Sequence, residues 1–440
     1  MDRFLGVVLL SAAALLAQDI PNPPQAAAGG SAAPVAITLQ NAIQRAQALV
    51  PEFRAAVTDA AVAREDRVQA RAALLPSVNY TTQYLYTQGN RTATPVFIAN
   101  NAVHEYVSQG NAHETLGLSG EQIGEFRRAR AAEALARARQ EAASRGLVMI
   151  VVQRFYDLVV TQRKQTSAQA AQAEAERFLK IGRQLEQGGE VAKSDVIKAQ
   201  LQFNDSERAL RETALALDKA RLALAVILFP DFNQDFTVVD DLSQARPLPG
   251  FADAQKMAAN NNPDSRAAFA GVQVAEREVQ VAWAGHFPTL SLDVWYGIDA
   301  NRFATYTDGV RNLGYSAAAT LNVPIWSWGA TQSKVKQAQL RRQQARVELS
   351  FAQRQAMSNL RAFFAEAETA QGELENLHNS AELAAESLRL TTLRYQGGEA
   401  TALEVVDAQN TLVQARNASD DGEARYRQAI AQLQTLTGMF

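Results

Sequence analysis

Two long parts of the chain carry apolar residues at a spacing of seven. In the first part, Phe203, Leu210, Leu217 and Leu224 recur every seven residues. A second, mostly smaller series lies between them, as Ala199, Ser206, Thr213, Ala220 and Ile227, and the other part of the chain keeps it as Ala408, Ala415, Gly422, Ala429 and Leu436. A row of large side chains beside a row of small ones is typical of closely packed coiled-coil helices.

The same parts of the chain lack prolines. All 13 prolines fall within 21–95, within 230–288 or at Pro324, and the remaining stretches are rich in Ala, Gln, Glu, Arg and Leu, which favour helices. We therefore predict long helices over 127–183, 191–229, 331–395 and 400–438. A helix of about 55 residues would be about 80 Å long. An ordinary helical bundle would explain the spacing but not this length.

Alternating polarity marks the predicted strands, which follow a proline in each half. In PSVNYTTQYLY (76–86) and PTLSLDVWYGI (288–298), apolar residues occupy every second position, and further candidates follow at 114–120 and 315–326. One apolar and one mainly polar face suit a membrane β-barrel, whereas a soluble sheet would leave exposed edges. Because roughly eight strands are needed to close a barrel, four strands per chain predict an oligomer.

The sequence contains two similar copies of one long repeat. EQGGEVAKSDVIKAQ (186–200) resembles YQGGEATALEVVDAQ (395–409), and residues 38–56 match 251–268 at an offset of 212 residues. Copies of this length are too long for a solenoid repeat, so we infer a tandem duplication. We expect a first repeat over 38–235, a connecting segment over 236–250 and a second repeat over 251–440.

Each copy places a Gly-Gly pair between its two predicted long helices. Gly188-Gly189 and Gly397-Gly398 can end one helix in a left-handed cap and let the chain reverse. Ser194 and Thr401 follow shortly afterwards and are suitable N-caps for the next helix. The sequence therefore predicts two helical hairpins whose tips are the glycine pairs.

The composition excludes several classes of function. The net charge of −3 gives no basic surface for nucleic acid. There are no cysteines, and the four histidines (His104, His113, His286 and His378) lack the spacing of metal ligands. The chain has no nucleotide-binding glycine motif, no HExxH and no nucleophile elbow. We predict a protein that is not an enzyme and uses no metal or cofactor.

The chain opens with a short apolar run from Phe4 to Ala17. This run is too short to span a bilayer but is typical of the core of a signal peptide. We therefore expect a signal peptide over 1–17 and a flexible linker over 18–37, with a short membrane anchor as the rival interpretation. No later segment has 18 consecutive apolar residues, so no transmembrane helix is predicted there.

In this order, the predicted elements resemble the TolC family of outer-membrane efflux proteins. The resemblance rests on 38–56 and 251–268, on VPIWSWGATQSKVKQA (323–338) and on RYQGGEATALEVVDAQNTLVQA (394–415), and it covers nearly everything after residue 37. It implies a mainly α fold with a small membrane β-barrel contribution. In a homotrimer, four strands per chain would form a 12-stranded barrel in the outer membrane of a Gram-negative bacterium, and the duplicated hairpins would form a periplasmic α-barrel tunnel.

The resemblance also implies a function. An inner-membrane pump and a periplasmic adaptor would load cargo, and the channel, surrounded by outer-membrane lipid, would conduct it passively to the exterior. The tip turns at 188–191 and 397–400 would dock the adaptor. One departure is that the first copy has no proline matching Pro324, so the geometry of its strand-to-helix junction (118–134) stays open.

Four residues at the tips match functional positions of the family. Glu404 and Asp407 match its acidic entrance residues, and their spacing puts both on one side of a helix. Three chains would supply six such carboxylates, which would attract cations. However, Thr401-x-x-Glu404 is also a capping box, so a purely structural role for Glu404 stays open. Asp195 and Tyr395 match the family's closed-gate hydrogen-bonding pair.

A soluble or peripheral periplasmic coiled-coil scaffold, or an adaptor protein, is the alternative function. Adaptors also contain long helical hairpins, but they carry one hairpin flanked by small β-domains. This chain has two predicted hairpins and paired strands. A scaffold would remain in solution without detergent, which separates it from a membrane channel.

Overall fold

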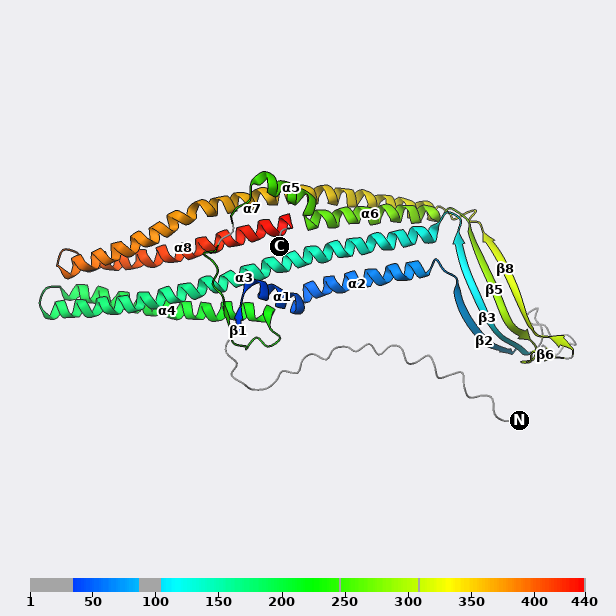
Figure 1. Cartoon of the computed structure of the whole chain (residues 1–440), viewed down its shortest axis with the longest axis horizontal. Coiled ribbons are helices and arrows are strands. Elements are labelled where there is room, and N and C mark those ends of the chain that lie inside the picture. Colours follow the sequence, from blue (N-terminus) through cyan, green and yellow to red (C-terminus); the bar gives the residue numbers. More distant parts are fainter. Residues whose placement is uncertain (1–34, 87–103, 245–246, 308, 439–440) are drawn as a thin grey trace, which may run out of the picture.

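The computed structural model describes residues 35–86, 104–244, 247–307 and 309–438. The expected signal peptide (1–17) and most of the expected linker (18–37) lie outside these residues. The described part is strongly elongated, with a sheet at one end, two helical hairpin tips at the other and long helices between them (Figure 1).

The helices of the described residues come in two matching series. The first consists of α1 (Leu39–Leu49), α2 (Pro51–Ala72), α3 (Glu121–Gln187) and α4 (Lys193–Leu228). The second consists of α5 (Phe251–Asn261), α6 (Pro263–Ala284), α7 (Ala330–Gln396) and α8 (Ala402–Thr437). Both series have lengths of 11, 22, 67 and 36 residues in that order. This agreement is what a tandem duplication requires, while the exact limits of the repeats stay a prediction.

The four predicted long helices are confirmed, although α3 begins six residues earlier than expected. Most of the small-residue heptad positions are buried between helices, namely Ala199, Ser206, Ala408, Gly422, Ala429 and Leu436. At Gly422 the approach is very close, because a Cβ built there would lie 2.5 Å from Cδ1 of Leu377 in α7. The small residues therefore set how tightly the helices of a hairpin can pack.

The helices form an open layer. In the half near the sheet, α2 packs on α3, α3 on α6 and α6 on α7, whereas near the tips the order is α4, α3, α8 and α7. The layer therefore has α2 and α4 along one edge and α7 along the other (Figure 1). Halfway along the molecule, α1 packs on α3 and α4, and α5 packs on α7 and α8; elsewhere within the described part of the chain no helix covers these two edges.

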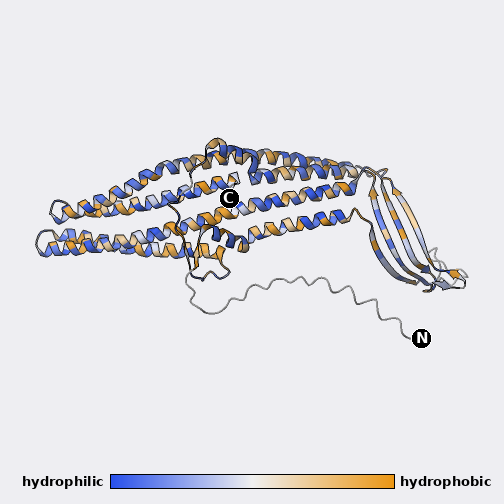
Figure 2. Ribbon diagram, in the orientation of Figure 1, coloured by the Kyte–Doolittle hydropathy of each residue, from blue (hydrophilic) through white to orange (hydrophobic). Residues whose placement is uncertain are grey.

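The largest apolar core lies halfway along the molecule. Val151, Val152 and Phe155 of α3 are fully buried there, against Leu224 of α4 and Ile37. Figure 2 shows the apolar residues of these elements meeting in this region. None of the described helices combines the length and the apolar character that crossing a bilayer requires.

Four antiparallel strands form the sheet, in the order β2 (Ser77–Tyr86), β3 (His104–Gly117), β5 (Thr289–Ala300) and β8 (Leu313–Asn322). The predicted strand positions are confirmed, but β3 begins ten residues earlier because its polar residues pair with both β2 and β5. β8 ends before Pro324, which has no N–H to extend the ladder. Among the described residues, β2 and β8 each pair on one side only, and a small hairpin of β6 (Tyr306–Thr307) and β7 (Val310–Arg311) lies between β5 and β8 in the chain.

The junction between β3 and α3 is closed by a glutamine. Oε1 of Gln122 accepts a hydrogen bond from the N–H of Gly117 at 2.9 Å, and its Nε2 donates to the carbonyl of Thr115 at 2.7 Å. Gly120, with φ of 75°, makes the turn into the helix, a conformation that favours glycine. The side chain of Gln122 thus closes the junction that lacks a proline.

The connecting segments pair with each other across the chain. Residues 35–37, expected at the end of the linker, instead form β1 (Val35–Ile37), which pairs in parallel with β4 (Phe236–Val238). Ile37 is fully buried in the central core. The partner strand lies about 200 residues away in the sequence, so local patterns could not reveal this pairing.

Gly297 and Gly314 face each other across β5 and β8, but only Gly297 is crowded. A Cβ built on Gly297 would lie 2.3 Å from the carbonyl oxygen of Ser108 and 2.4 Å from Cα of Gln109, whereas nothing lies within 4 Å of one built on Gly314. We expect Gly297→Ala to force β3 and β5 apart and to cost about 1–3 kcal/mol, while Gly314→Ala stays nearly neutral. Thermal unfolding in detergent checks this, and equal midpoints would contradict it.

Candidate functional site

The two hairpin tips have nearly identical backbone geometry. The first glycine of each pair stays helical, with φ of −76° at Gly188 and −83° at Gly397, and the second is left-handed, with φ of 75° at Gly189 and 78° at Gly398. The next N–H then reaches back to a helix carbonyl, from Glu190 to Leu185 at 2.9 Å and from Glu399 to Arg394 at 2.8 Å. This is the hydrogen-bond pattern of a Schellman cap. The predicted glycine reversals are therefore confirmed at both tips.

The caps that follow the two tips differ. Thr401 and Glu404 form a complete capping box, in which Oγ1 of Thr401 accepts from the N–H of Glu404 at 3.3 Å and Oε1 of Glu404 accepts from the N–H of Thr401 at 3.1 Å. The prediction for Ser194 is wrong. The helix α4 begins at Lys193, so its N-cap is Ala192, which makes no side-chain cap bond.

Glu404 and Asp407 lie one turn apart on the exposed side of α8. Hydrogen bonds from the N–H and hydroxyl of Thr401 lower the pKa of Glu404 below its usual range, and Arg394, 3.6 Å away, adds to this effect. Glu404 is therefore an ionised carboxylate at neutral pH. The capping role of Glu404 is confirmed, and a further role of both residues in a ring stays a prediction.

Tyr395 and Asp195 do not hydrogen-bond to each other within the chain. Tyr395 is 2% exposed and packs on Phe178, with ring centroids 5.1 Å apart. Its hydroxyl is buried and has no hydrogen-bond partner among the described residues. Burial and then the charge of Asp195 raise the pKa of this hydroxyl. Asp195 itself pairs with Lys198 at 3.2 Å, and the gate hydrogen bond between Asp195 and Tyr395 stays a prediction.

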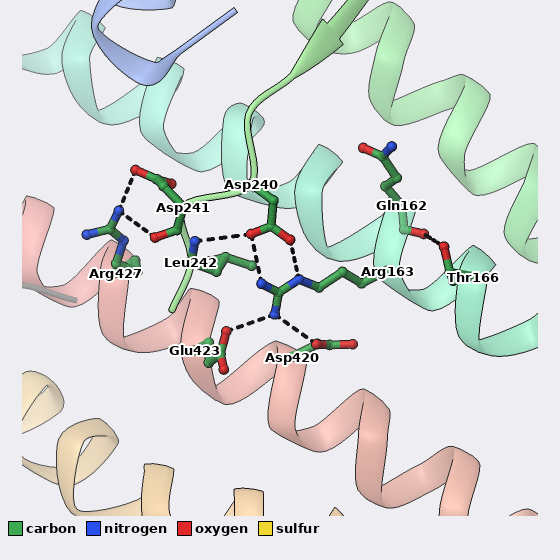
Figure 3. Close-up of polar contacts among 9 residues, drawn as sticks. All are labelled: Gln162, Arg163, Thr166, Asp240, Asp241, Leu242, Asp420, Glu423 and Arg427. Atoms are coloured by element: carbon green, nitrogen blue, oxygen red, sulfur yellow. Dashed lines mark hydrogen bonds and ion pairs between the residues drawn. The ribbon is translucent and has the colours of Figure 1, made fainter. Parts of the chain in front are cut away.

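A second group of polar contacts, which the sequence did not reveal, lies halfway along the molecule. The strap, which we define as residues 236–244, crosses α3 and α8, and Arg163 of α3 binds it (Figure 3). Both carboxylate oxygens of Asp240 accept from Arg163, one of them at 2.7 Å from Nη2, and Nη1 of Arg163 donates to Asp420 at 3.1 Å and to Glu423 at 2.8 Å. One guanidinium thus ties the strap, α3 and α8 together.

Arg427 of α8 makes a second clasp on the strap. It donates to a carboxylate oxygen of Asp241 at 2.6 Å and to the carbonyls of Asp241 and Gln244 at 3.0 Å (Figure 3). Its guanidinium also lies 5.3 Å from the ring centroid of Tyr156, whose pKa is raised to about 12, mainly by burial. The only sequence signal for these clasps is the Asp240-Asp241 pair, and nothing nearby in the chain identifies its arginine partners.

The chemistry of both groups is structural or electrostatic. Among the described residues, no group of three or more His, Asp or Glu side chains could hold a metal ion. The tips offer exposed carboxylates and backbone turns, and the clasps hold the two hairpins to the strap.

Comparisons with known proteins give this arrangement a context. The family model described as "Outer membrane efflux protein" matches residues 42–228 and 255–439, which is most of the chain.

The chain belongs to the outer membrane efflux protein family.

Curated relatives of this efflux protein match over most of their length. TolC of Vibrio cholerae is 24% identical over 396 residues, which cover 88% of this chain and 87% of the relative. TolC of Escherichia coli is 26% identical over 425 residues, covering 92% and 82%. The alkaline protease secretion protein AprF of Pseudomonas aeruginosa is 23% identical over 399 residues, covering 88% and 82%.

Solved structures share the fold. The CmeC outer membrane channel of Campylobacter jejuni superposes with a TM-score of 0.79 at 17% identity, covering 91% of this chain and 85% of that one. The open state of the MtrE outer membrane channel of Neisseria gonorrhoeae gives 0.79 at 21% identity, covering 91% and 88%. This efflux protein is therefore an export channel of the Gram-negative outer membrane, with its helical part in the periplasm. The family match decides for the channel over the scaffold or adaptor alternative.

The capping box of the efflux protein gives a local prediction at the second tip. Thr401→Ala removes the acceptor for the N–H of Glu404, and losing such a cap costs about 1 kcal/mol. We expect the first-turn amides of α8 to exchange hydrogen about fivefold faster, as measured by hydrogen–deuterium exchange. Ser194→Ala at the first tip is the control and should leave exchange in α4 unchanged; an equal effect there would contradict the assignment.

The clasp gives a prediction about two neighbouring aspartates. Arg163 and the N–H of Leu242 lower the pKa of Asp240 despite its burial, whereas burial raises the pKa of Asp420. We expect Asp240→Asn to destabilise the protein by about 1 kcal/mol, less than the usual contribution of hydrogen bonds to charged groups, because its side chain is 43% exposed. Asp420→Asn should cost less, because burial disfavours its charge.

The pH dependence of Asp240→Asn checks the cause. A pKa lowered by folding gives stability that is fully present above the unfolded pKa and is lost as the pH falls through the lower folded pKa. Denaturant unfolding should therefore separate Asp240→Asn from the unmodified protein at neutral pH, and the difference should vanish in strong acid. A difference that persists there would point to packing rather than to charge.

Proposed function

We propose that this efflux protein works as a homotrimer that conducts cargo from the periplasm to the exterior. A periplasmic adaptor docks on its tips, and an inner-membrane pump supplies the cargo. Glu404 and Asp407 line the periplasmic gate. Transport through the channel is passive, and the chain has no enzymatic activity.

The observation that carries the proposal is the open layer. β2 and β8 each pair on one side only among the described residues, and α2, α4 and α7 form the edges of the helical part, which α1 and α5 cover only halfway along the molecule. Unpaired strand edges must be covered by further chain, and roughly eight strands are needed to close a barrel. Three copies of a four-stranded sheet satisfy both requirements and join the helical layers into one tube.

The exposed carboxylates of α8 support the gate. Glu404 and Asp407 lie at i and i+3 and both are exposed, and Glu404 is held ionised by Thr401. Around a threefold axis they supply six carboxylates at the narrow end of the tube. Such a ring raises the local cation concentration. The capping box and the ring are compatible, because the cap uses one carboxylate oxygen of Glu404.

The docking partner and the direction of transport rest on separate observations. Both tips end in turns of glycine and glutamate whose side chains are exposed, so backbone and carboxylate groups are available to an adaptor. The relatives include proteins named for protease secretion and for pyoverdine export. Their names support transport out of the cell, of proteases in two relatives and of pyoverdine in another.

Conductance in planar bilayers tests the channel and the gate together. We expect the purified protein to conduct with a preference for cations, and the Glu404→Gln/Asp407→Asn variant to conduct with that preference largely lost. Glu190→Gln/Glu399→Gln removes the same number of charges from the tip turns and is the matched control. Unchanged selectivity in the first variant would leave Glu404 as a helix cap only. A protein that stays monomeric and soluble without detergent would contradict the channel itself.

A further inference from the structure

The tip half of the molecule has two uncovered helix faces, one on each edge of the layer. Its helices pack in the order α4, α3, α8 and α7, so the outer face of α4 and the outer face of α7 point away from each other (Figure 1). Both tips lie at the same end of the molecule and share one small core, in which Phe178 and Ala199 meet Tyr395 and Val405. Heights above the tips can therefore be compared between the two faces.

The α4 face combines exposed apolar residues with cations. Arg208, Arg211 and Lys219 lie on it at helical spacing and are exposed. The apolar residues of the same face are each 48–64% exposed, namely Ile197, Leu201, Leu215, Leu222 and Val226. Single exposed apolar residues are ordinary, but a continuous stripe of them along an edge indicates an interface.

The α7 face is acidic. Between residues 362 and 388, α7 contains six glutamates and no lysine or arginine, and Arg389 follows and pairs with Glu386 at 2.7 Å. Glu366 and Glu373 lie on the side toward α8 and pair with Arg425 of that helix. The other four lie together on the outer face, as Glu368, Glu375, Glu382 and Glu386. Nearer the tip this face becomes apolar, where Leu390 and Leu393 are 46% and 52% exposed.

Residues of similar character lie at similar distances from the tips on the two faces. Ile197 and Leu201 lie about 4 and 8 residues from the tip end of α4, and Leu393 and Leu390 about 3 and 6 residues from that of α7.

The charged residues of both faces lie farther from the tips than these apolar residues. Arg208 and Arg211 lie at about 15 and 18 residues, between Glu382 at about 14 and Glu375 at about 21. Lys219 at about 26 residues meets Glu368 at about 28, a difference of about 3 Å along the helix.

We propose that the α4 face of one chain packs against the α7 face of a second copy of this chain, with Arg208 and Arg211 opposite Glu382 and Glu375, and Lys219 opposite Glu368. This inference rests on the proposed homotrimer and names the surfaces that join it. A rotation axis along the tube keeps every residue at its own height, so levels that match within one chain also match between copies. The pairing is heterologous, and it closes into a ring of three when each copy is rotated by one third of a turn from the next.

The contacts that these groups already make within the chain are exposed, including that of Glu382 with His378 at 3.2 Å. Arg208 lies 3.3 Å from Asp205 and 3.5 Å from Glu212, and Arg211 lies 3.6 Å from Glu207, all exposed neighbours on α4 itself. Such pairs between exposed side chains of one helix are weak. A second helix that covers the apolar stripe would remove water from the cations and strengthen their attraction to glutamates at the same level.

Cysteine cross-linking tests the register directly, because the chain has no cysteine of its own. We expect Lys219→Cys/Glu368→Cys in the full-length trimer in detergent to give covalent dimers and trimers with a short bis-maleimide. Each single variant should stay monomeric on a denaturing gel. Lys219→Cys/Glu382→Cys is the matched control: it uses the same two faces, but the two sites differ by about 18 Å in height and should not link.

The outcomes separate this inference from the proposed function. A protein that is trimeric by mass in detergent but does not link at 219 and 368 would overturn the interface and leave the trimer standing. A monomer by mass would overturn both. Equal linking of the mismatched pair would overturn the register. In intact cells, a product containing a different protein in place of a second copy would assign these faces to another partner and overturn the proposal.

Charge reversal gives a second readout. Arg208→Glu/Arg211→Glu should lose the trimer at low salt, and adding Glu375→Arg/Glu382→Arg to the same chain should restore it, because each copy then carries both reversed faces. Arg177→Glu/Lys180→Glu is the control, since these α3 side chains are equally exposed and equally paired to local glutamates. Failure of the four-residue variant to recover, with a helical spectrum like that of the unmodified protein, would overturn the pairing.

Discussion

Unpaired edges are the constraint on which this structure depends. Backbone N–H and C=O groups along β2 and β8 have no partner on one side within the described residues, and the helices continue the same two edges as α2, α4 and α7. A layer one element thick leaves both of its edges open along most of its length, even though apolar cores lie between its helices. The layer formed by one chain therefore needs further chain to cover both of its edges.

Within the layer, most of the buried stabilising contacts lie halfway along the molecule. The central core buries Val151, Phe155 and Leu224, and the strap adds the Arg163 and Arg427 clasps on its surface. The tips have a smaller core and an unpaired buried hydroxyl at Tyr395. Regions with few buried contacts open at lower free energy than the centre. The distribution of contacts therefore fits an assembly held firmly in the middle and adjusted at its periplasmic end.

Duplication supplied two copies of one hairpin, and their surfaces have diverged. The backbones of the two tip turns agree within a few degrees of φ, because both need a left-handed glycine. At equivalent positions, however, the N-cap is Ala192 in the first copy and Thr401 in the second, and Lys198 of the first copy corresponds to Asp407 of the second. The glycines that define the backbone of the tips are the same in both copies. Exposed positions differ in charge, because no buried core depends on the charge of an exposed side chain.

The sequence by itself determined the four long helices to within six residues at either end, the glycine reversals, the capping box and the places of the four sheet strands, although not the start of β3. Each of these follows from local propensities or from a short period, such as the seven-residue spacing that ends with Leu224 or the motif Thr401-x-x-Glu404. Only the tertiary structure decided what lies far apart in the chain: the pairing of β1 with β4, and the arginines that hold Asp240 and Asp241. A polar residue in a loop carries no local mark of its partner, and the partner here comes from a helix about 75 or more residues away. The prediction of Ser194 as an N-cap failed because the backbone, and not the residue type, sets where a helix begins, and α4 begins one residue earlier at Lys193.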